Sequence, residues 1–245
     1  MDPKGKIALI TGGTRIGKTV AELLAKRGCD LVLSYRTSGS AAEETVERAQ
    51  RLGVRAAAVQ ADLTSEADIL RLIREVERLF NRLDVLVNMA SVYRKVPFEK
   101  LDRRAWEENL ASDLESAYQL CVQVAPLMRR GGSGRIVNFS DWTAASGRPR
   151  YKQYLPYYVG KHGVLALTEV LALELAPNIL VNAIAPGPIL APPDLSPEAE
   201  DEVRKATPLG RWGGAEEIAK TVLFLIETDF VTGECIRVDG GRHLH

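Results

Sequence analysis

The sequence alternates short aliphatic stretches with longer segments of helical periodicity along almost its whole length. Most of the aliphatic stretches are continuously apolar, which is typical of strands buried on both faces of a parallel sheet. They read KIALIT, LVLSY, AAAVQ, VLVN, RIVNFS, ILVNAIA and CIRVDG. We therefore predict an α/β fold: a single-domain, Rossmann-type, doubly wound parallel sheet of about seven strands, with helices on both faces.

The segments between these strands carry apolar residues at helical spacing. The predicted helices cover residues 16–27, 41–52, 66–80, 103–128, 157–175 and 215–226. The boundaries carry the expected signals, since residues 64–66 offer an N-cap with an acid, and Gly28 and Gly53 follow helices as C-terminal stops.

One region breaks the alternation, because residues 186–208 contain prolines at positions 186, 188, 192, 193, 197 and 208. That density is too high for regular sheet or a long helix. Ligands of open α/β sheets bind outside the carboxyl ends of the strands, and this region follows such a strand. We expect a loop that covers the substrate crevice; a surface connection without a role is the alternative.

Composition narrows the possible functions. The chain has 245 residues, 46% of them hydrophobic, which is enough for one sizeable core. The 32 basic residues balance 32 acidic ones, so no overall positive field favours nucleic acid or an anionic membrane. The N-terminus lacks a cationic segment followed by a long apolar one. We expect a cytoplasmic protein with a small-molecule substrate and neither membrane nor nucleic acid as partner.

Cysteine and histidine are too scarce and scattered for a disulfide framework, a metal site or a Ser-His-Asp triad. They are Cys29, Cys121, Cys235, His162, His243 and His245. We predict that no metal is bound.

The glycine turn TGGTRIG, residues 11–17, lies between the first strand and the first helix. Glycines there let the backbone approach a pyrophosphate, and the helix N-terminus offers free N–H groups and a partial positive charge. A dinucleotide site is predicted, although a tight turn without a ligand would use the same residues.

The end of the second strand indicates which dinucleotide is preferred. An NAD enzyme normally holds an acid there, whereas this chain has Ser34, Tyr35 and Arg36. Arg36 could pair with a 2′-phosphate, and Arg15 could approach the same group, so NADP(H) is predicted. Both arginines could instead be solvated surface charges. Asp62 could accept a hydrogen bond from the adenine amine or begin the cap of the next helix.

Seven segments, in order, resemble the short-chain dehydrogenase/reductase family along essentially the whole chain. They are TGGTRIG, ADLTS, LDVLVNMAS, RIVNFSD, Tyr157-x-x-x-Lys161, VNAIAPGPI and VTGECIRVDGG. The resemblance implies a homotetramer built partly from the 103–128 and 157–175 helices. It also implies these cofactor contacts: Gly12, Thr14, Arg15, Ile16, Tyr35, Arg36, Asp62, Leu63, Asn88, Ala90, Tyr157, Lys161, Pro186, Gly187 and Ile189.

The same resemblance makes Tyr157 the general acid/base and Lys161 the group that lowers its pKa and holds the nicotinamide ribose. The chemistry is consistent, because a phenol with an unperturbed pKa of about 10 needs a nearby ammonium to act as a base at neutral pH. Tyr154 and Tyr158 lack such a partner and are expected to pack.

Three features depart from the family pattern. The glycine turn is one residue shorter than usual, with Arg15 near the usual second glycine. Asp113 stands where an Asn of the proton relay is usual, and is a further candidate catalytic residue. Asp141 replaces the serine that polarises a carbonyl.

Asp141, Arg15 and the residues after the fourth strand resemble the bacterial pteridine reductase-like branch. That branch implies that Ser91, Tyr93, Asp141 and Tyr157 bind the substrate, with the Tyr93 ring stacked on a pterin. It also implies that Tyr157 and Asp141 supply the proton to a ring nitrogen.

The resulting functional hypothesis is an NADPH-dependent reductase of a dihydropterin or dihydrofolate. One alternative is a carbonyl reductase of 3-oxoacyl thioesters or small ketones. The other is a catalytically silent nucleotide-binding regulator, which the intact Tyr157 and Lys161 disfavour.

Overall fold

The structure is a computed structural model and describes residues 1–192 and 195–244. Pro193 therefore lies outside the described residues of the proline-rich region, as does His245 at the C-terminus. Seven strands form one sheet, in the order β3-β2-β1-β4-β5-β6-β7, and all described pairs are parallel. The strands are β1 (Ile7–Thr11), β2 (Asp30–Tyr35), β3 (Ala56–Gln60), β4 (Val85–Asn88), β5 (Gly134–Phe139), β6 (Ile179–Pro186) and β7 (Cys235–Val238). The predicted Rossmann-type fold is confirmed.

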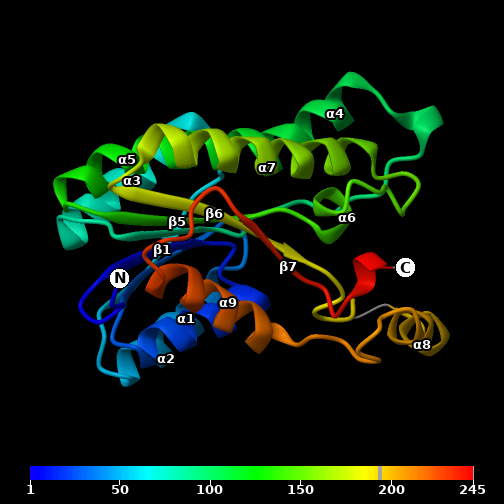
Figure 1. The fold of residues 1–245 in the computed structure, drawn as a ribbon. Helices are drawn as coiled ribbons and strands as arrows, with labels where there is room; N and C mark the ends of the chain where they lie inside the picture. The colour runs from blue at the N-terminus through cyan, green and yellow to red at the C-terminus, as the bar shows by residue number, and fades with distance from the viewer. Residues whose placement is uncertain (193–194, 245) are drawn as a thin grey trace.

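Helices cover both faces of the sheet (Figure 1). They are α1 (Ile16–Lys26), α2 (Gly39–Arg51), α3 (Glu66–Phe80), α4 (Arg103–Leu110), α5 (Ser116–Arg130), α6 (Trp142–Ala145), α7 (Leu155–Leu175), α8 (Pro197–Lys205) and α9 (Ala215–Glu227). One apolar core packs α3, α5 and α7 against the sheet through residues such as Leu72 and Leu120. The other packs α1, α2 and α9 through residues such as Leu24 and Val222. This double burial explains why the central strands are mostly apolar.

The expected helix boundaries are found. The Ser65 side chain accepts a hydrogen bond from the Asp68 backbone N–H at the start of α3. Gly28 and Gly53 follow α1 and α2 with φ of 77° and 89°, a left-handed conformation that costs glycine little. Among the described residues, no helix is both long and apolar enough to cross a membrane.

The predicted 103–128 helix is not continuous, which corrects the sequence prediction. A π-helical turn, Ala111–Glu115, separates α4 from α5. Such turns insert one extra residue into a helix and often mark functional positions. Apolar periodicity does not reveal the insertion, because the helix continues on both sides of it.

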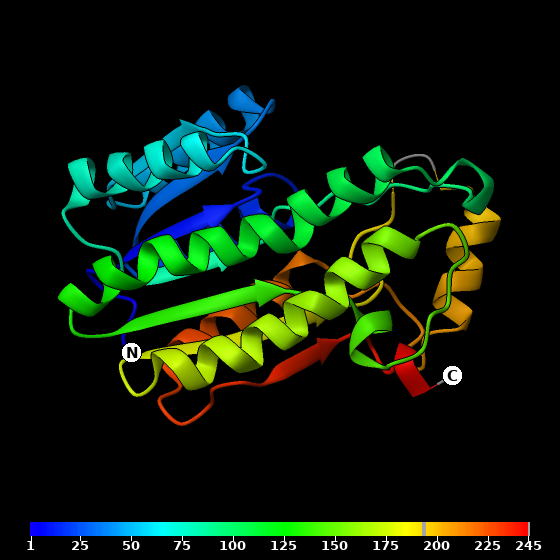
Figure 2. The ribbon, with the colours of Figure 1, turned by 90° about the horizontal axis from the view of Figure 1, so that it is seen from above.

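The proline-rich region is also more regular than predicted, because it contains α8. The Ser196 side chain caps this helix by accepting from the Ala199 backbone N–H, and Pro197 occupies the first turn, where its missing N–H costs nothing. The strands all point toward the end of the molecule where α8 and the C-terminus lie (Figure 2). The region thus stands at the carboxyl edge of the sheet.

Candidate active site

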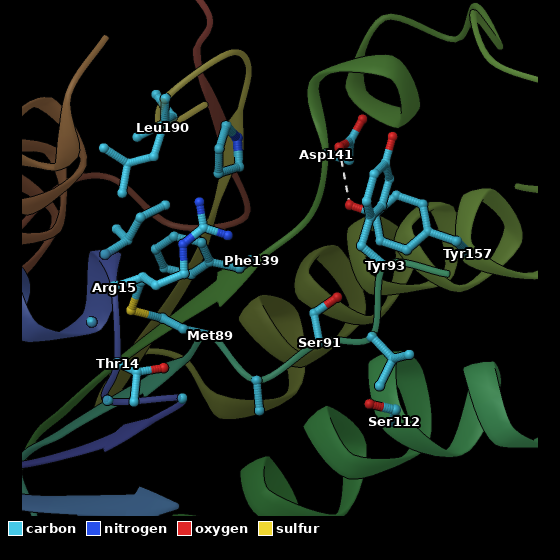
Figure 3. Close-up of a pocket in the computed structure, with 18 of the residues that line it drawn as sticks. Thr14, Arg15, Met89, Ser91, Tyr93, Ser112, Phe139, Asp141, Tyr157 and Leu190 are labelled. Carbon is cyan, nitrogen blue, oxygen red and sulfur yellow. Dashed lines mark hydrogen bonds between the residues drawn. The ribbon is translucent and has the colours of Figure 1, made fainter. Parts of the chain in front are cut away.

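A cavity of about 640 Å³ opens at the carboxyl ends of the strands (Figure 3). Its volume is typical of a cofactor or ligand site. Sixteen of the predicted site residues line it: Gly12, Thr14, Arg15, Ile16, Tyr35, Arg36, Asp62, Leu63, Ala90, Ser91, Tyr93, Asp141, Tyr157, Pro186, Gly187 and Ile189. Asn88, Lys161 and Asp113 are not among the lining residues and lie buried behind it.

The glycine turn is shaped by close backbone approach. A Cβ on Gly17 would lie 2.4 Å from the Gly12 carbonyl oxygen, and a Cβ on Gly12 would lie 3.1 Å from the Ala90 backbone nitrogen. The start of α1 has no side-chain cap and no acidic residue in its first turn. The Gly17 N–H donates to the Thr14 carbonyl oxygen at 3.0 Å, but no acidic side chain offsets the positive end of the helix dipole, which fits the pyrophosphate of a dinucleotide.

Arg15 lines the cavity, and its contact with a 2′-phosphate stays a prediction. It has φ of 52° and ψ of −111°, a backbone conformation at positive φ that is strained for a long side chain such as arginine. Its Nη2 donates to the Ala191 carbonyl oxygen at 3.4 Å, so the side chain reaches toward the loop after β6 (Figure 3). Arg36 is exposed at the end of β2, where a 2′-phosphate would lie in a dinucleotide site.

Two predicted nucleotide contacts have structural roles. Asp62 Oδ1 accepts hydrogen bonds from the Thr64 backbone N–H at 3.0 Å and the Thr64 hydroxyl at 2.8 Å, which fits the capping alternative. Asn88 is buried, and its Nδ2 donates to Asn138 Oδ1 at 2.9 Å across the β4–β5 pair. Asp62 still faces the cavity, whereas Asn88 is not among its lining residues, so a contact of Asn88 with the cofactor stays a prediction.

Tyr157 and Asp141 form the most direct contact between predicted catalytic residues. The Tyr157 hydroxyl donates to Asp141 Oδ2 at 3.0 Å. Asp141 Oδ1 accepts from the Thr143 backbone N–H at 2.8 Å and the Thr143 hydroxyl at 2.5 Å, which caps α6. One carboxylate therefore serves both the helix and the phenol.

Lys161 is buried one helical turn beyond Tyr157 on α7. Its Nζ donates to the Phe139 carbonyl oxygen at 2.9 Å and lies 5.7 Å from the centre of the Tyr157 ring. Asp113 Oδ1 lies 3.7 Å from the same Nζ. The ammonium is thus partly neutralised by a carboxylate contributed by the π-helical turn.

The sequence predicts that Lys161 lowers the pKa of Tyr157, but the surroundings of the phenol act in the opposite direction. Burial raises the pKa of the Tyr157 phenol well above its ordinary value, and the nearby carboxylates of Asp141 and Asp113 raise it further. Desolvation and negative charge both disfavour a phenolate. Lys161, the ammonium nearest the phenol, is paired with the Asp113 carboxylate at 3.7 Å.

Several aromatic residues surround the predicted substrate position. Tyr93 stacks on Tyr154 with ring centres 4.3 Å apart, and its ring meets that of Tyr157 edge-on at 4.9 Å. One face of Tyr93 is therefore occupied by Tyr154, which packs as expected. Sequence reasoning missed several lining residues, namely Trp142, Tyr151, Trp212 and Arg242. Only the position of Trp142 next to Asp141 could have indicated one of them.

Comparisons with known proteins find similar sequences along almost the whole chain. The family model described as enoyl-(acyl carrier protein) reductase matches residues 13–243. A 3-oxoacyl-[acyl-carrier-protein] reductase of Aquifex aeolicus is 37% identical over 245 residues, covering 97% of this chain and 97% of that protein.

Two solved structures have the same fold over nearly the whole chain. A short-chain dehydrogenase/reductase from Serratia marcescens has a TM-score of 0.91 at 30% identity, covering 99% of this chain and 100% of that one. An NADPH-dependent 3-quinuclidinone reductase from Rhodotorula rubra has a TM-score of 0.92 at 28% identity, covering 100% of this chain and 93% of that one. The chain belongs to the short-chain dehydrogenase/reductase family of oxidoreductases.

Proposed function

We propose that the protein is an NADPH-dependent reductase of small carbonyl compounds, with 3-oxoacyl thioesters as the leading substrate class. The observation that carries this proposal is Tyr157, a phenol that lines the cavity at the carboxyl ends of the strands, with Lys161 buried one helical turn away. The compared relatives are named as reductases of 3-oxoacyl-[acyl-carrier-protein] and of 3-quinuclidinone, which supports carbonyl reduction.

Each residue has a distinct role in this reaction. The reduced nicotinamide, when bound, supplies the hydride. Tyr157 donates its proton to the substrate atom that gains negative charge. Arg36 at the end of β2 would recognise the 2′-phosphate, since no acid stands there to bind a free ribose hydroxyl. The start of α1, which has no acidic residue in its first turn, would bind the pyrophosphate through the positive end of its helix dipole.

A dihydropterin or dihydrofolate is the second candidate substrate, and Asp141 favours it. The neighbouring hydroxyls are already used, since Ser140 Oγ donates to the Lys161 carbonyl oxygen at 2.8 Å and Thr143 donates to Asp141. Neither hydroxyl therefore replaces the serine that polarises a ketone. A carboxylate can accept hydrogen bonds from the N–H groups of a pterin, whereas it has no proton to donate to the carbonyl oxygen of a ketone.

Cofactor oxidation with a panel of substrates tests the proposal. The purified protein is mixed with NADPH and, separately, with acetoacetyl thioester, dihydrobiopterin and dihydrofolate. Faster turnover of the thioester supports the carbonyl reductase, and faster turnover of either pterin supports the second candidate. Tight NADPH binding without oxidation in any mixture would make the protein a silent nucleotide-binding regulator.

We also propose a homotetramer that uses α5 and α7. Both helices expose apolar side chains, including Tyr118 and Val122 on α5 and Val170 and Leu173 on α7. Exposed apolar groups of this kind favour association. Light scattering during gel filtration measures the mass, and a monomer would overturn this proposal.

A further inference from the structure

Asp113 occupies an unusual position for a carboxylate. It lies in the π-helical turn between α4 and α5, and its side chain is fully buried. Oδ1 lies 3.7 Å from Lys161 Nζ and accepts from the Val92 backbone N–H at 3.3 Å. Oδ2 has no hydrogen-bond partner among the described residues. A buried carboxylate held this way needs a nearby positive charge, and Lys161 provides it.

The charges around Tyr157 come from several elements. Asp141 faces the phenol from the start of α6, Asp113 lies nearby in the π-helical turn, and Lys161 is on α7. The other titratable neighbours are the phenols Tyr93 and Tyr154. Two carboxylates and one ammonium leave a formal charge of −1 around the phenol. An asparagine in place of Asp113 would leave a formal charge of zero.

We propose that Asp113 is a positioning residue that acts as the counter-charge of Lys161 and thereby keeps Tyr157 a protonated phenol, ready to donate its proton during reduction. Only the effect of Asp113 on catalysis rests on the proposed function. The pairing itself depends on the buried contact between Asp113 and Lys161.

The consequence for the reaction follows from the movement of the proton. During reduction, the carbonyl carbon gains a hydride with its electron pair, which a bound reduced nicotinamide would supply and so become oxidised. The π bond of the carbonyl breaks, and the oxygen takes the proton from Tyr157. The resulting phenolate stands among negative charges, so it recovers a proton from solvent readily. Oxidation of an alcohol needs the phenolate at the outset, and Asp113 therefore disfavours oxidation at neutral pH.

Titration of Tyr157 in the natural protein is the first test, and it needs no substrate. Tyrosine is labelled with ¹³C at the Cζ position, and the Tyr157 signal is assigned by its loss in Tyr157→Phe. The proposal requires that this signal does not titrate until the pH exceeds about 10, the ordinary value for tyrosine. A midpoint below that value in the natural chain overturns the proposal.

Asp113→Asn is the second test, because it keeps the side-chain shape and removes one negative charge. The Tyr157 midpoint should fall by about one pH unit or more, since Lys161 then acts without its counter-charge. Glu115→Gln is the matched control, because Glu115 lies in the same π-helical turn but is exposed. It should leave the midpoint unchanged. An unshifted midpoint in folded Asp113→Asn overturns the proposal.

The pH profile of the reverse reaction gives the catalytic readout. In Asp113→Asn, the rate of alcohol oxidation should rise at a lower pH than in the natural protein, by the same shift as the phenol midpoint. If the pH profile of alcohol oxidation does not shift although the Tyr157 titration midpoint does, Asp113 has no influence on catalysis, and the catalytic part of the proposal is overturned. If no alcohol or ketone is turned over, the proposed function fails, while the two titrations still decide whether Asp113 sets the state of Tyr157.

Discussion

The Tyr157 hydroxyl donates to Asp141 Oδ2 at 3.0 Å, while the other oxygen of the same carboxylate caps α6 through Thr143. Tyr157, the proposed proton donor, is therefore hydrogen-bonded to Asp141, which stands where the family usually has a serine. Because the carboxylate is fixed by the helix start, it cannot turn away from the phenol without losing the cap. This shared contact makes Asp141 the residue that best separates the two candidate substrate classes.

Replacing Asp141 with serine should change the two activities in opposite directions. Serine can still cap α6, so folding should be retained. Dihydropterin or dihydrofolate reduction should fall by about tenfold or more, whereas ketone reduction should stay equal or improve, because a hydroxyl can donate to the developing oxyanion. The measurement is kcat/KM for each substrate. An equal loss of both activities would show that Asp141 is structural.

Arg36→Ala should reduce the preference for NADPH over NADH by about tenfold or more. Charge-assisted hydrogen bonds to a 2′-phosphate contribute about 1.5–3 kcal/mol, and Arg36 is exposed at the place where that group would bind. The ratio of kcat/KM for the two cofactors is the readout. Arg51→Ala, at the end of α2 and outside the cavity lining, is the control and should not change the ratio. Equal efficiency with both cofactors in the natural protein contradicts the prediction.

Tyr157→Phe should abolish most turnover and leave the fold intact. The substitution removes only the hydroxyl that contacts Asp141, at a cost of about 1 kcal/mol in the free energy of unfolding. Steady-state rates and urea unfolding measure the two effects. Tyr154→Phe, whose ring stacks on Tyr93, should keep much more activity. Near-normal rates in folded Tyr157→Phe would assign the proton donor elsewhere, with Asp141 as the first alternative.

The pH dependence of stability should carry the signature of the buried Tyr157 phenol. Its pKa is raised in the folded protein by burial and by the carboxylates of Asp141 and Asp113. The native state therefore binds the proton more tightly than the unfolded chain. The resulting stability is fully present below about pH 10, the unfolded value, and is lost as the pH rises through the folded pKa. Between pH 8 and 11, roughly, the natural protein should lose more unfolding free energy than Tyr157→Phe; equal losses would contradict the raised pKa.

The three cysteines should be poorly reactive in the folded protein. Burial raises the pKa of the Cys29 and Cys121 thiols to about 12 and that of Cys235 to about 11. Because the thiolate is the nucleophile, a thiol reagent near pH 8 should label none of them quickly. In urea, all three should react. Rapid labelling of Cys29 or Cys121 in the folded chain would contradict their burial.

The sequence by itself determined the α/β class, the succession of strands and most helix boundaries. These features follow from local patterns, since apolar runs and helical spacing are properties of short segments. The position of Tyr157 and Lys161 one turn apart was likewise readable, because a helix places residues four apart on one face. The α8 helix was missed, because the prolines around it masked a short segment capped by Ser196.

Only the tertiary structure decided the electrostatics of the site. Lys161 Nζ lies 3.7 Å from Asp113, which is 48 positions earlier in the chain and lies in the π-helical turn. The pKa of Tyr157 is raised by burial and by the carboxylates of Asp141 and Asp113, which no local pattern encodes. The sequence identified Asp113, Lys161 and Tyr157 as candidates, and the fold determined which charged groups lie next to each of them.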